Sequence, residues 1–162
     1  MTLNTLRDYF PDATEETWHQ HSNGGGWVEN TATVDDTAFV GPDAVVSGDA
    51  RVSSEAMVSG NALVCGSARV SGDALVSGNA VVYGNARVSG NAQVFGYASV
   101  LEFAIVSGIA RVYGDALVSG NATVYGNARV SGNADVSGYA RVAGNADVLG
   151  DDVVSDNIRV LW

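Results

Sequence analysis

The feature that most constrains the fold is a valine at every sixth position, from Val28 to Val160, without exception. Alanine recurs with the same period from Ala32 to Ala146, and each of these alanines comes two residues before a valine. Side chains two residues apart in a β-strand point to the same side. Glycine follows most of these valines by two residues, and Asn or Asp often comes next, as is typical of tight turns. Each six-residue unit therefore predicts one short strand, with Ala and Val turned inward, followed by one corner.

A chain of such units that all turn the same way predicts a parallel β-solenoid. The Val-Ser-Gly-Asn-Ala segments that begin at residues 58, 88 and 130 resemble the repeat of the hexapeptide-repeat family. This resemblance implies an all-β fold, a left-handed parallel β-helix of triangular cross-section with eighteen residues in each coil, and the repeat is long enough for about seven coils. The stretch Gly-Gly-Gly-Trp-Val at 24–28 is similar to the same stretch in uncharacterised bacterial and bacteriophage repeat proteins.

The repeat divides the chain into two parts. Residues 1–26 lack it and are predicted to form an N-terminal cap segment, with a short helix that starts at Asp12 or Thr14 and runs to Trp18. Residues 27–162 are predicted to form the β-helix, and Trp162 is expected to help cover its far end. We expect no second domain.

Charge and hydropathy restrict the partners. The net charge is −10, and all eight basic residues are arginines, which argues against binding to nucleic acid polymers or to a membrane surface. No apolar run is long enough to span a bilayer, and the N-terminus does not resemble a secretion signal. We therefore expect a cytoplasmic protein, in the host cytoplasm if a bacteriophage encodes it. The single cysteine, Cys65, cannot form an internal disulfide.

The residue just before each repeat valine is predicted to face outward, and it differs between the three faces of the prism. Two faces carry many large apolar side chains, which a monomer would not normally leave in water. We expect them to form a homo-oligomer interface, and the family resemblance favours a trimer. The predicted interface residues, Leu101 from a corner included, are Val45, Leu63, Val81, Leu101, Leu117, Met57 and Leu75. The alternative is that Val and Leu merely suit a strand surface.

Seven of the eight arginines occupy the same outward register, five of them on one face. Stacked guanidinium groups repel one another unless something compensates their charge. Either corner acids such as Glu55, Asp73 and Asp115 neutralise them, or an anionic ligand or partner does.

The most irregular stretch of the repeat lies in the middle of the chain, over residues 95–113. A spacing of eighteen places Phe95 directly below Tyr113, outside the Val-Ala interior. These aromatic residues are either the centre of the oligomer interface or a pocket for a planar ligand near the arginines. The candidate ligand-binding residues are Arg87, Phe95, Tyr97, Phe103, Arg111, Tyr113 and Arg129.

The sequence contains few residues that could act in catalysis. Many members of the resembled family are acyltransferases, which use a histidine base and a protruding loop, but here the repeat runs without an insertion. The only histidines, His19 and His21, lie before the repeat and are too few for a complete zinc site. We therefore predict no catalytic residues, no metal site and no cofactor, and interpret Asp151, Asp152 and Asp156 as a solvated C-terminal end.

These observations favour a non-catalytic, homo-oligomeric β-solenoid that binds or sequesters a planar, anionic, nucleotide-like small molecule between subunits. A bacteriophage sponge that removes a nucleotide signal of host immunity would fit this chemistry. Two alternatives remain open: a structural or protein-interaction module, such as a phage fibre or assembly component, and a hexapeptide-repeat acyltransferase.

Overall fold

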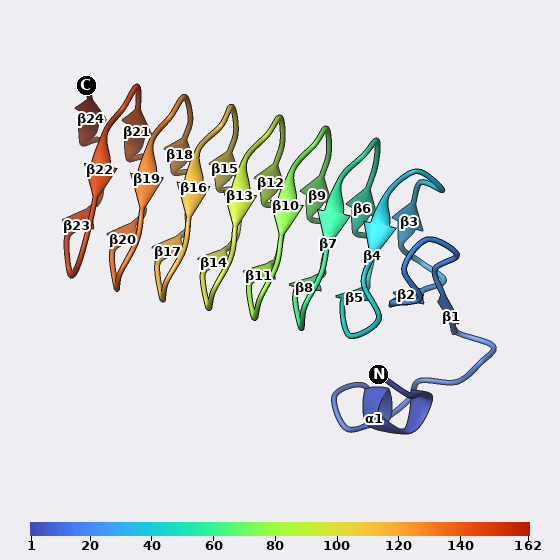
Figure 1. The fold of residues 1–162 in the computed structure, drawn as a ribbon. Helices are drawn as coiled ribbons and strands as arrows, with labels where there is room; N and C mark the ends of the chain where they lie inside the picture. The colour runs from blue at the N-terminus through green and yellow to red at the C-terminus, as the bar shows by residue number, and fades with distance from the viewer.

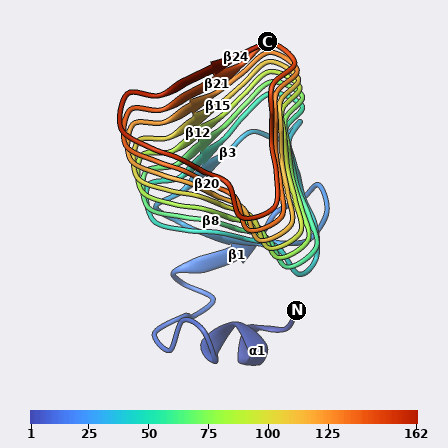
Figure 2. The same cartoon turned by 90° about the vertical axis from the view of Figure 1, so that its left-hand side faces the viewer.

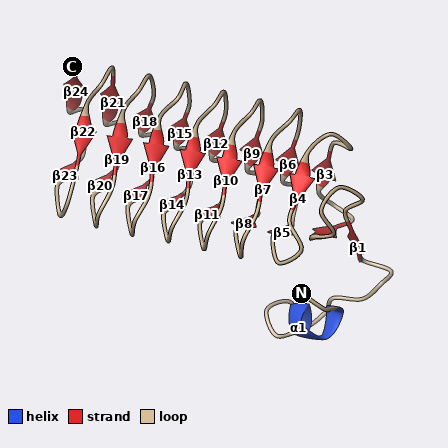
Figure 3. Cartoon of the chain, viewed as in Figure 1, coloured by secondary structure: helices blue, strands red, loops and turns tan.

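The computed structural model describes all residues, 1–162, and shows three parallel β-sheets wound into a triangular prism (Figures 1 and 2). Almost all of its regular structure is short strands joined by turns (Figure 3). Sheet A contains, beside the antiparallel strand β1 (Trp18–Gln20), the strands β2 (Trp27–Glu29), β5 (Val45–Val46), β8 (Leu63–Val64), β11 (Val81–Val82), β14 (Ser99–Val100), β17 (Leu117–Val118), β20 (Asp135–Val136) and β23 (Val153–Val154).

The other two sheets complete each coil. Sheet B contains β3 (Thr33–Val34), β6 (Arg51–Val52), β9 (Arg69–Val70), β12 (Arg87–Val88), β15 (Ile105–Val106), β18 (Thr123–Val124), β21 (Arg141–Ala143) and β24 (Arg159–Leu161). Sheet C contains β4 (Phe39–Val40), β7 (Met57–Val58), β10 (Leu75–Val76), β13 (Gln93–Val94), β16 (Arg111–Val112), β19 (Arg129–Val130) and β22 (Asp147–Val148).

The coil has the predicted period. Every parallel pair joins residues eighteen apart, as in Trp27 with Val45 on sheet A and Arg111 with Arg129 on sheet C. The chain completes seven coils and adds β23 and β24, which makes about eight turns. Viewed from the C-terminal end in Figure 2, the chain passes clockwise from sheet A to sheet B to sheet C as it approaches the viewer. The coil is therefore left-handed, which confirms the predicted fold.

The interior consists of the two invariant series. One continuous cluster of 40 buried residues contains Val28, Val40 and every repeat alanine and valine from Ala44 to Val136, and it ends at Val154. The outward residue before each valine is exposed or half-buried in most coils. Small and branched side chains fill this narrow core at every level, so the outer surface can vary without disturbing it.

Glycine holds the corners because the backbone there is left-handed. Gly78, for example, has φ of +71°, and a Cβ on it would lie 2.9 Å from both N and O of Gly96 in the next coil. Glu102 occupies the equivalent position with φ of +62°, and its carboxylate accepts a hydrogen bond from Gly120 N at 2.7 Å.

The N-terminal segment differs from the prediction. The prediction of a helix from residue 12 or 14 to Trp18 is wrong. Only one turn forms there, in which Trp18 N donates to Thr14 O at 2.9 Å. Trp18 then leaves that turn to pair with Glu29 in an antiparallel bridge between β1 and β2. The helix α1 lies earlier, at Leu3–Arg7, where the Thr2 hydroxyl accepts from Thr5 N at its N-terminus.

This segment contacts both the first coil and the outer surface of sheet A. Strand β1 covers the edge of β2, and Val40 N donates to Asn23 O. Leu6 and Trp18 pack with Trp27 and Val45 in a separate small core.

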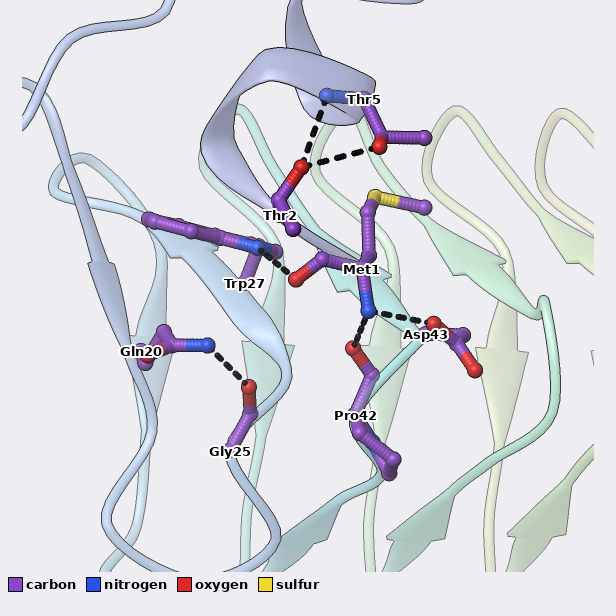
Figure 4. A network of polar contacts seen from close by, with 8 residues as sticks. All are labelled: Met1, Thr2, Thr5, Gln20, Gly25, Trp27, Pro42 and Asp43. Carbon is purple, nitrogen blue, oxygen red and sulfur yellow. Dashed lines mark hydrogen bonds and ion pairs between the residues drawn. The ribbon is translucent and has the colours of Figure 1, made fainter.

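Polar contacts hold the start of α1 against the prism (Figure 4). The Trp27 indole donates to Met1 O at 3.2 Å, and the Met1 ammonium contacts Pro42 O and the Asp43 carboxylate. Residues 1–15 therefore lie beside the prism, over sheet A, whereas residues 16–26 bond to its first coil, with Glu16 O and Thr17 O both accepting from Asn30. No helix in the structure is long and apolar enough to cross a membrane.

Candidate functional site

The structure separates the predicted ligand-binding residues into two groups. Phe95, Tyr97 and Tyr113 lie on the corner that joins sheet C to sheet A, and Arg111 and Arg129 lie beside them on sheet C. The other two residues lie elsewhere: Arg87 is on sheet B and Phe103 is on the corner that leads from sheet A to sheet B. Phe95, Tyr97, Tyr113, Arg111 and Arg129 are therefore the predicted residues that lie close enough together to contact one ligand.

Two aromatic rings of this group stack as the period of eighteen predicts. The ring centroids of Phe95 and Tyr113 are 4.9 Å apart, and their planes differ by 1°. Both side chains are half-buried. Each ring has one face covered by the other, so the freely exposed aromatic side chain on this corner is Tyr97, at 66% exposure.

The arginines form a pair in neighbouring coils. Arg111 on β16 and Arg129 on β19 are direct partners in the parallel register, and both are exposed. Strands in one sheet lie about 4.8 Å apart, so the two guanidinium groups can reach one ligand. Arg111 and Tyr113 belong to the same strand end, two residues apart, which places the arginine pair on the same side of the chain as the aromatic stack.

A groove of about 460 Å³ runs along the arginine pair. Its lining residues are Ile109, Arg111, Asn127, Arg129, Asn145 and Asp147. The Asn127 amide donates to Asn145 Oδ1 at 3.0 Å, so the two asparagines form one column beside the arginines. Sequence reasoning did not include Asn127 and Asn145 in the site. The signal was present, since each corner residue two positions before an outward residue lies on the same side of the strand.

No arginine of the coils lies within 4.0 Å of a carboxylate oxygen, although Asp147 is the register partner of Arg129 and lines the same groove. The only ion pair within 4.0 Å joins the Met1 ammonium to Asp43. Glu55, Asp73 and Asp115 therefore form no ion pair with the arginines within 4.0 Å. Each of these acids follows its arginine by four residues, and the chain turns a corner between them.

Acids elsewhere bind backbone instead. Glu29 accepts from Gly48 N at 2.7 Å, and Asp35 accepts from Ser54 N at 2.9 Å. Such bonds satisfy corner N–H groups of the next coil and leave the guanidinium groups to solvent or to a ligand.

Charge is also distributed unevenly along the prism. Residues 56–134 contain three acids (Asp73, Glu102 and Asp115) and four arginines, although the whole chain carries −10. The excess negative charge belongs to the two ends of the chain. An anion approaching the middle coils therefore meets a weaker repulsion than the net charge suggests.

The histidines lie apart from this groove, in the N-terminal segment. His19 Nδ1 is 2.8 Å from Asn30 Oδ1, whereas His21 is buried and its Nδ1 lies 3.2 Å from Asn23 O. No group of three or more His, Cys, Asp or Glu side chains is arranged to hold a metal ion.

The predicted interface residues are placed unequally. Val45 is buried beneath the N-terminal segment, and Leu63 packs against the same small core. A second groove, of about 640 Å³, lies between Tyr9 and Phe10 on one side and Leu63 and Val81 on the other. The remaining predicted residues, Leu101, Leu117 and Leu75, are half-buried, and Met57 is 44% exposed.

Comparison with known proteins agrees with this architecture. A family model described as YdcK beta solenoid repeat matches residues 68–84, 82–96, 110–126, 118–132 and 124–138. These stretches include Arg111, Arg129 and the Phe95–Tyr113 stack. The fold and this match define the chain as a β-solenoid repeat protein. No curated protein matches the chain.

Proposed function

We propose that this β-solenoid is a non-catalytic binding protein that takes a planar, anionic small molecule such as a nucleotide on the outer surface of sheet C. The observation that supports it best is the pair Arg111 and Arg129, which lie on neighbouring strands, line one groove and have no carboxylate partner within 4.0 Å. Arginine presents a planar fork of donors that matches a phosphate or carboxylate.

The surroundings of the pair suit the rest of such a ligand. The amides of Asn127 and Asn145 can donate to oxygens of the anionic group from one edge of the groove. Tyr97, on the opposite corner of sheet C, offers an exposed ring on which a planar group can stack. The anion would lie across the two arginines, with its planar part toward the corner that carries Phe95 and Tyr113.

The proposal includes self-association. Large apolar side chains remain exposed on coils that the N-terminal segment does not cover. Among them are Tyr83, at 53% exposure, and Phe103, at 58%. A homo-oligomer, with a trimer as the expected form, would bury such residues and could enclose the ligand between subunits. The resemblance to hexapeptide-repeat proteins of bacteria and bacteriophages adds a role to this proposal, the sequestration of a nucleotide signal.

A thermal-shift screen with mono-, di- and cyclic nucleotides tests the binding. A ligand present at about one hundred times its Kd stabilises the folded state by about 2.7 kcal/mol, which raises the Tm of a domain this size by several degrees. Arg111→Gln combined with Arg129→Gln should abolish the shift. Arg51→Gln combined with Arg69→Gln, on sheet B, is the matched control and should retain it.

A flat screen, or a shift that survives Arg111→Gln with Arg129→Gln, would overturn the proposal. The same exposed aromatic residues favour a second candidate, a structural or protein-interaction module. That candidate predicts no nucleotide response and a loss of self-association in Tyr83→Ser with Phe103→Ser, measured by sedimentation.

A further inference from the structure

A second pair of arginines lies on sheet B, in the last coils of the prism. Arg141 on β21 and Arg159 on β24 are direct partners in the parallel register, and both are exposed. A groove of about 300 Å³ runs along them. Its lining residues are Asn121, Thr123, Tyr139, Arg141, Asn157 and Arg159. The groove has the same construction as the one on sheet C, with a column of corner residues beside a column of outward strand residues.

Tyr125 holds one of these arginines in place. The Arg141 guanidinium lies 5.7 Å from the centroid of the Tyr125 ring, and its Nη2 donates to the Tyr125 hydroxyl at 3.4 Å. A guanidinium over an aromatic ring loses part of its conformational freedom before any ligand arrives. No other arginine of the coils has such a ring contact. Tyr125 itself does not line the groove, so its contact restrains Arg141 from the neighbouring corner and leaves the groove open.

The groove also contains polar groups without partners. Neither Arg141 nor Arg159 lies within 4.0 Å of a carboxylate oxygen, although Asp156 is on the adjacent corner. The Thr123 hydroxyl is buried and has no hydrogen-bond partner. The Tyr139 side chain is 64% exposed at the rim. All four side chains can donate a hydrogen bond, so the groove offers several donors to an anionic ligand.

We propose that this groove on sheet B is a separate binding site for a small tetrahedral oxyanion, a phosphate group. Two guanidinium forks in neighbouring coils can each give a charge-assisted hydrogen bond to one phosphate, and the Tyr139 hydroxyl can supply a third donor. The groove is smaller than the one on sheet C, about 300 Å³ against about 460 Å³, and it has room for a phosphate group. The site does not depend on the function proposed for sheet C.

Titration with inorganic phosphate tests the site. The protein used is the full chain carrying Arg111→Gln and Arg129→Gln, which removes the arginine pair on sheet C as a competing anion site. Phosphate should bind with Kd of about 1 mM and shift the backbone amide signals of Tyr139 and Arg159 in nitrogen-15 NMR spectra. Adding Arg141→Gln and Arg159→Gln should weaken binding at least about tenfold, because each removed fork loses charge-assisted hydrogen bonds.

Three further measurements test whether phosphate binds at this groove. Tyr125→Phe retains the ring, removes the hydroxyl contact and should weaken binding by less than the arginine changes do. Arg51→Gln with Arg69→Gln, in the same outward column of sheet B, is the control and should leave binding unchanged. Raising the salt concentration should weaken binding, since exposed charges are screened.

Phosphate binding that is absent, or that persists when Arg141 and Arg159 are both replaced, would overturn the proposal. Amide spectra that remain dispersed in each variant would show that the fold is intact. Loss of the nucleotide-dependent thermal shift in Arg111→Gln with Arg129→Gln, with phosphate binding retained, would separate the two sites.

Discussion

The corners of the coil give a quantitative test of the structure. In Gly78→Ala the new Cβ would lie 2.9 Å from both N and O of Gly96, closer than van der Waals contact, at a residue with φ of +71°. Gly150 has a similar φ of +64°, but no atom lies within 4 Å of the position its Cβ would take. The two substitutions therefore share the strain of a left-handed alanine and differ in the contact with the next coil.

The magnitudes follow from that difference. A left-handed alanine costs about 1–2 kcal/mol, and the reduced freedom of the unfolded chain returns about 0.4–1 kcal/mol in both variants. Overpacking against backbone that cannot move aside adds about 1–3 kcal/mol in Gly78→Ala alone. We expect Gly150→Ala to lower the free energy of unfolding by at most about 1.6 kcal/mol, and Gly78→Ala to lower it by about 1–3 kcal/mol more.

Urea unfolding followed by circular dichroism measures both variants against the parent chain. Repeat arrays do not always unfold in one step, so the comparison rests on the whole unfolding curve and on the Tm of each variant. Equal destabilisation by the two substitutions would refute the reasoning, because it would mean that coils do not approach closely at Gly78. Greater damage from Gly150→Ala would refute it more strongly.

Three further predictions concern the surface and the N-terminal segment. Leu6→Ala removes a fully buried side chain and should destabilise docking of that segment by about 2–5 kcal/mol, seen as a change in tryptophan fluorescence while the circular dichroism of the coils persists. Phe95→Ala removes the stack on Tyr113 and should lower stability by about 1–2 kcal/mol, whereas Tyr97→Ala, at a largely exposed residue, should stay within about 0.5 kcal/mol in the same thermal melts. Burial raises the pKa of the Cys65 thiol from 9.0 to about 11, so iodoacetamide should alkylate the folded protein more slowly than the urea-unfolded chain at pH 9. The folded state holds this proton more tightly, so the stabilisation it provides should be present below pH 9 and lost as pH rises toward 11.

The interior could be predicted from the sequence because its signal is strictly periodic. Val100 and Ala104 keep their places even where Leu101, Glu102 and Phe103 replace the usual corner residues, and all of the coil follows from that regularity. The stack of Phe95 on Tyr113 could be predicted for the same reason, since a period of eighteen fixes which residues are vertical neighbours.

Features without a period could not be predicted in this way. The sequence contains good capping residues at Thr2 and at Thr14, and only tertiary contacts with Trp27 and Val45 favour the helix at the first of them. The burial of Val45 depends on the same contact, which no repeat spacing encodes. The grouping of Arg111 and Arg129 with Asn127 needed the orientation of corner residues as well as the strand register.

Both grooves arise from one property of the repeat. Inward positions are confined to Ala and Val, so each coil already buries its core, whatever side chain stands outside. An arginine placed before the valine in two successive coils then sets two guanidinium groups side by side, and a residue two positions earlier supplies the wall of a groove. Asparagines stand in the corner column of both grooves; sheet C adds an aromatic corner on its other side, and sheet B adds Tyr125 beside Arg141. Substitutions at outward positions can therefore change the lining of one groove at little cost to the stability of the prism, which is why two grooves of different size occur on a single uninterrupted solenoid.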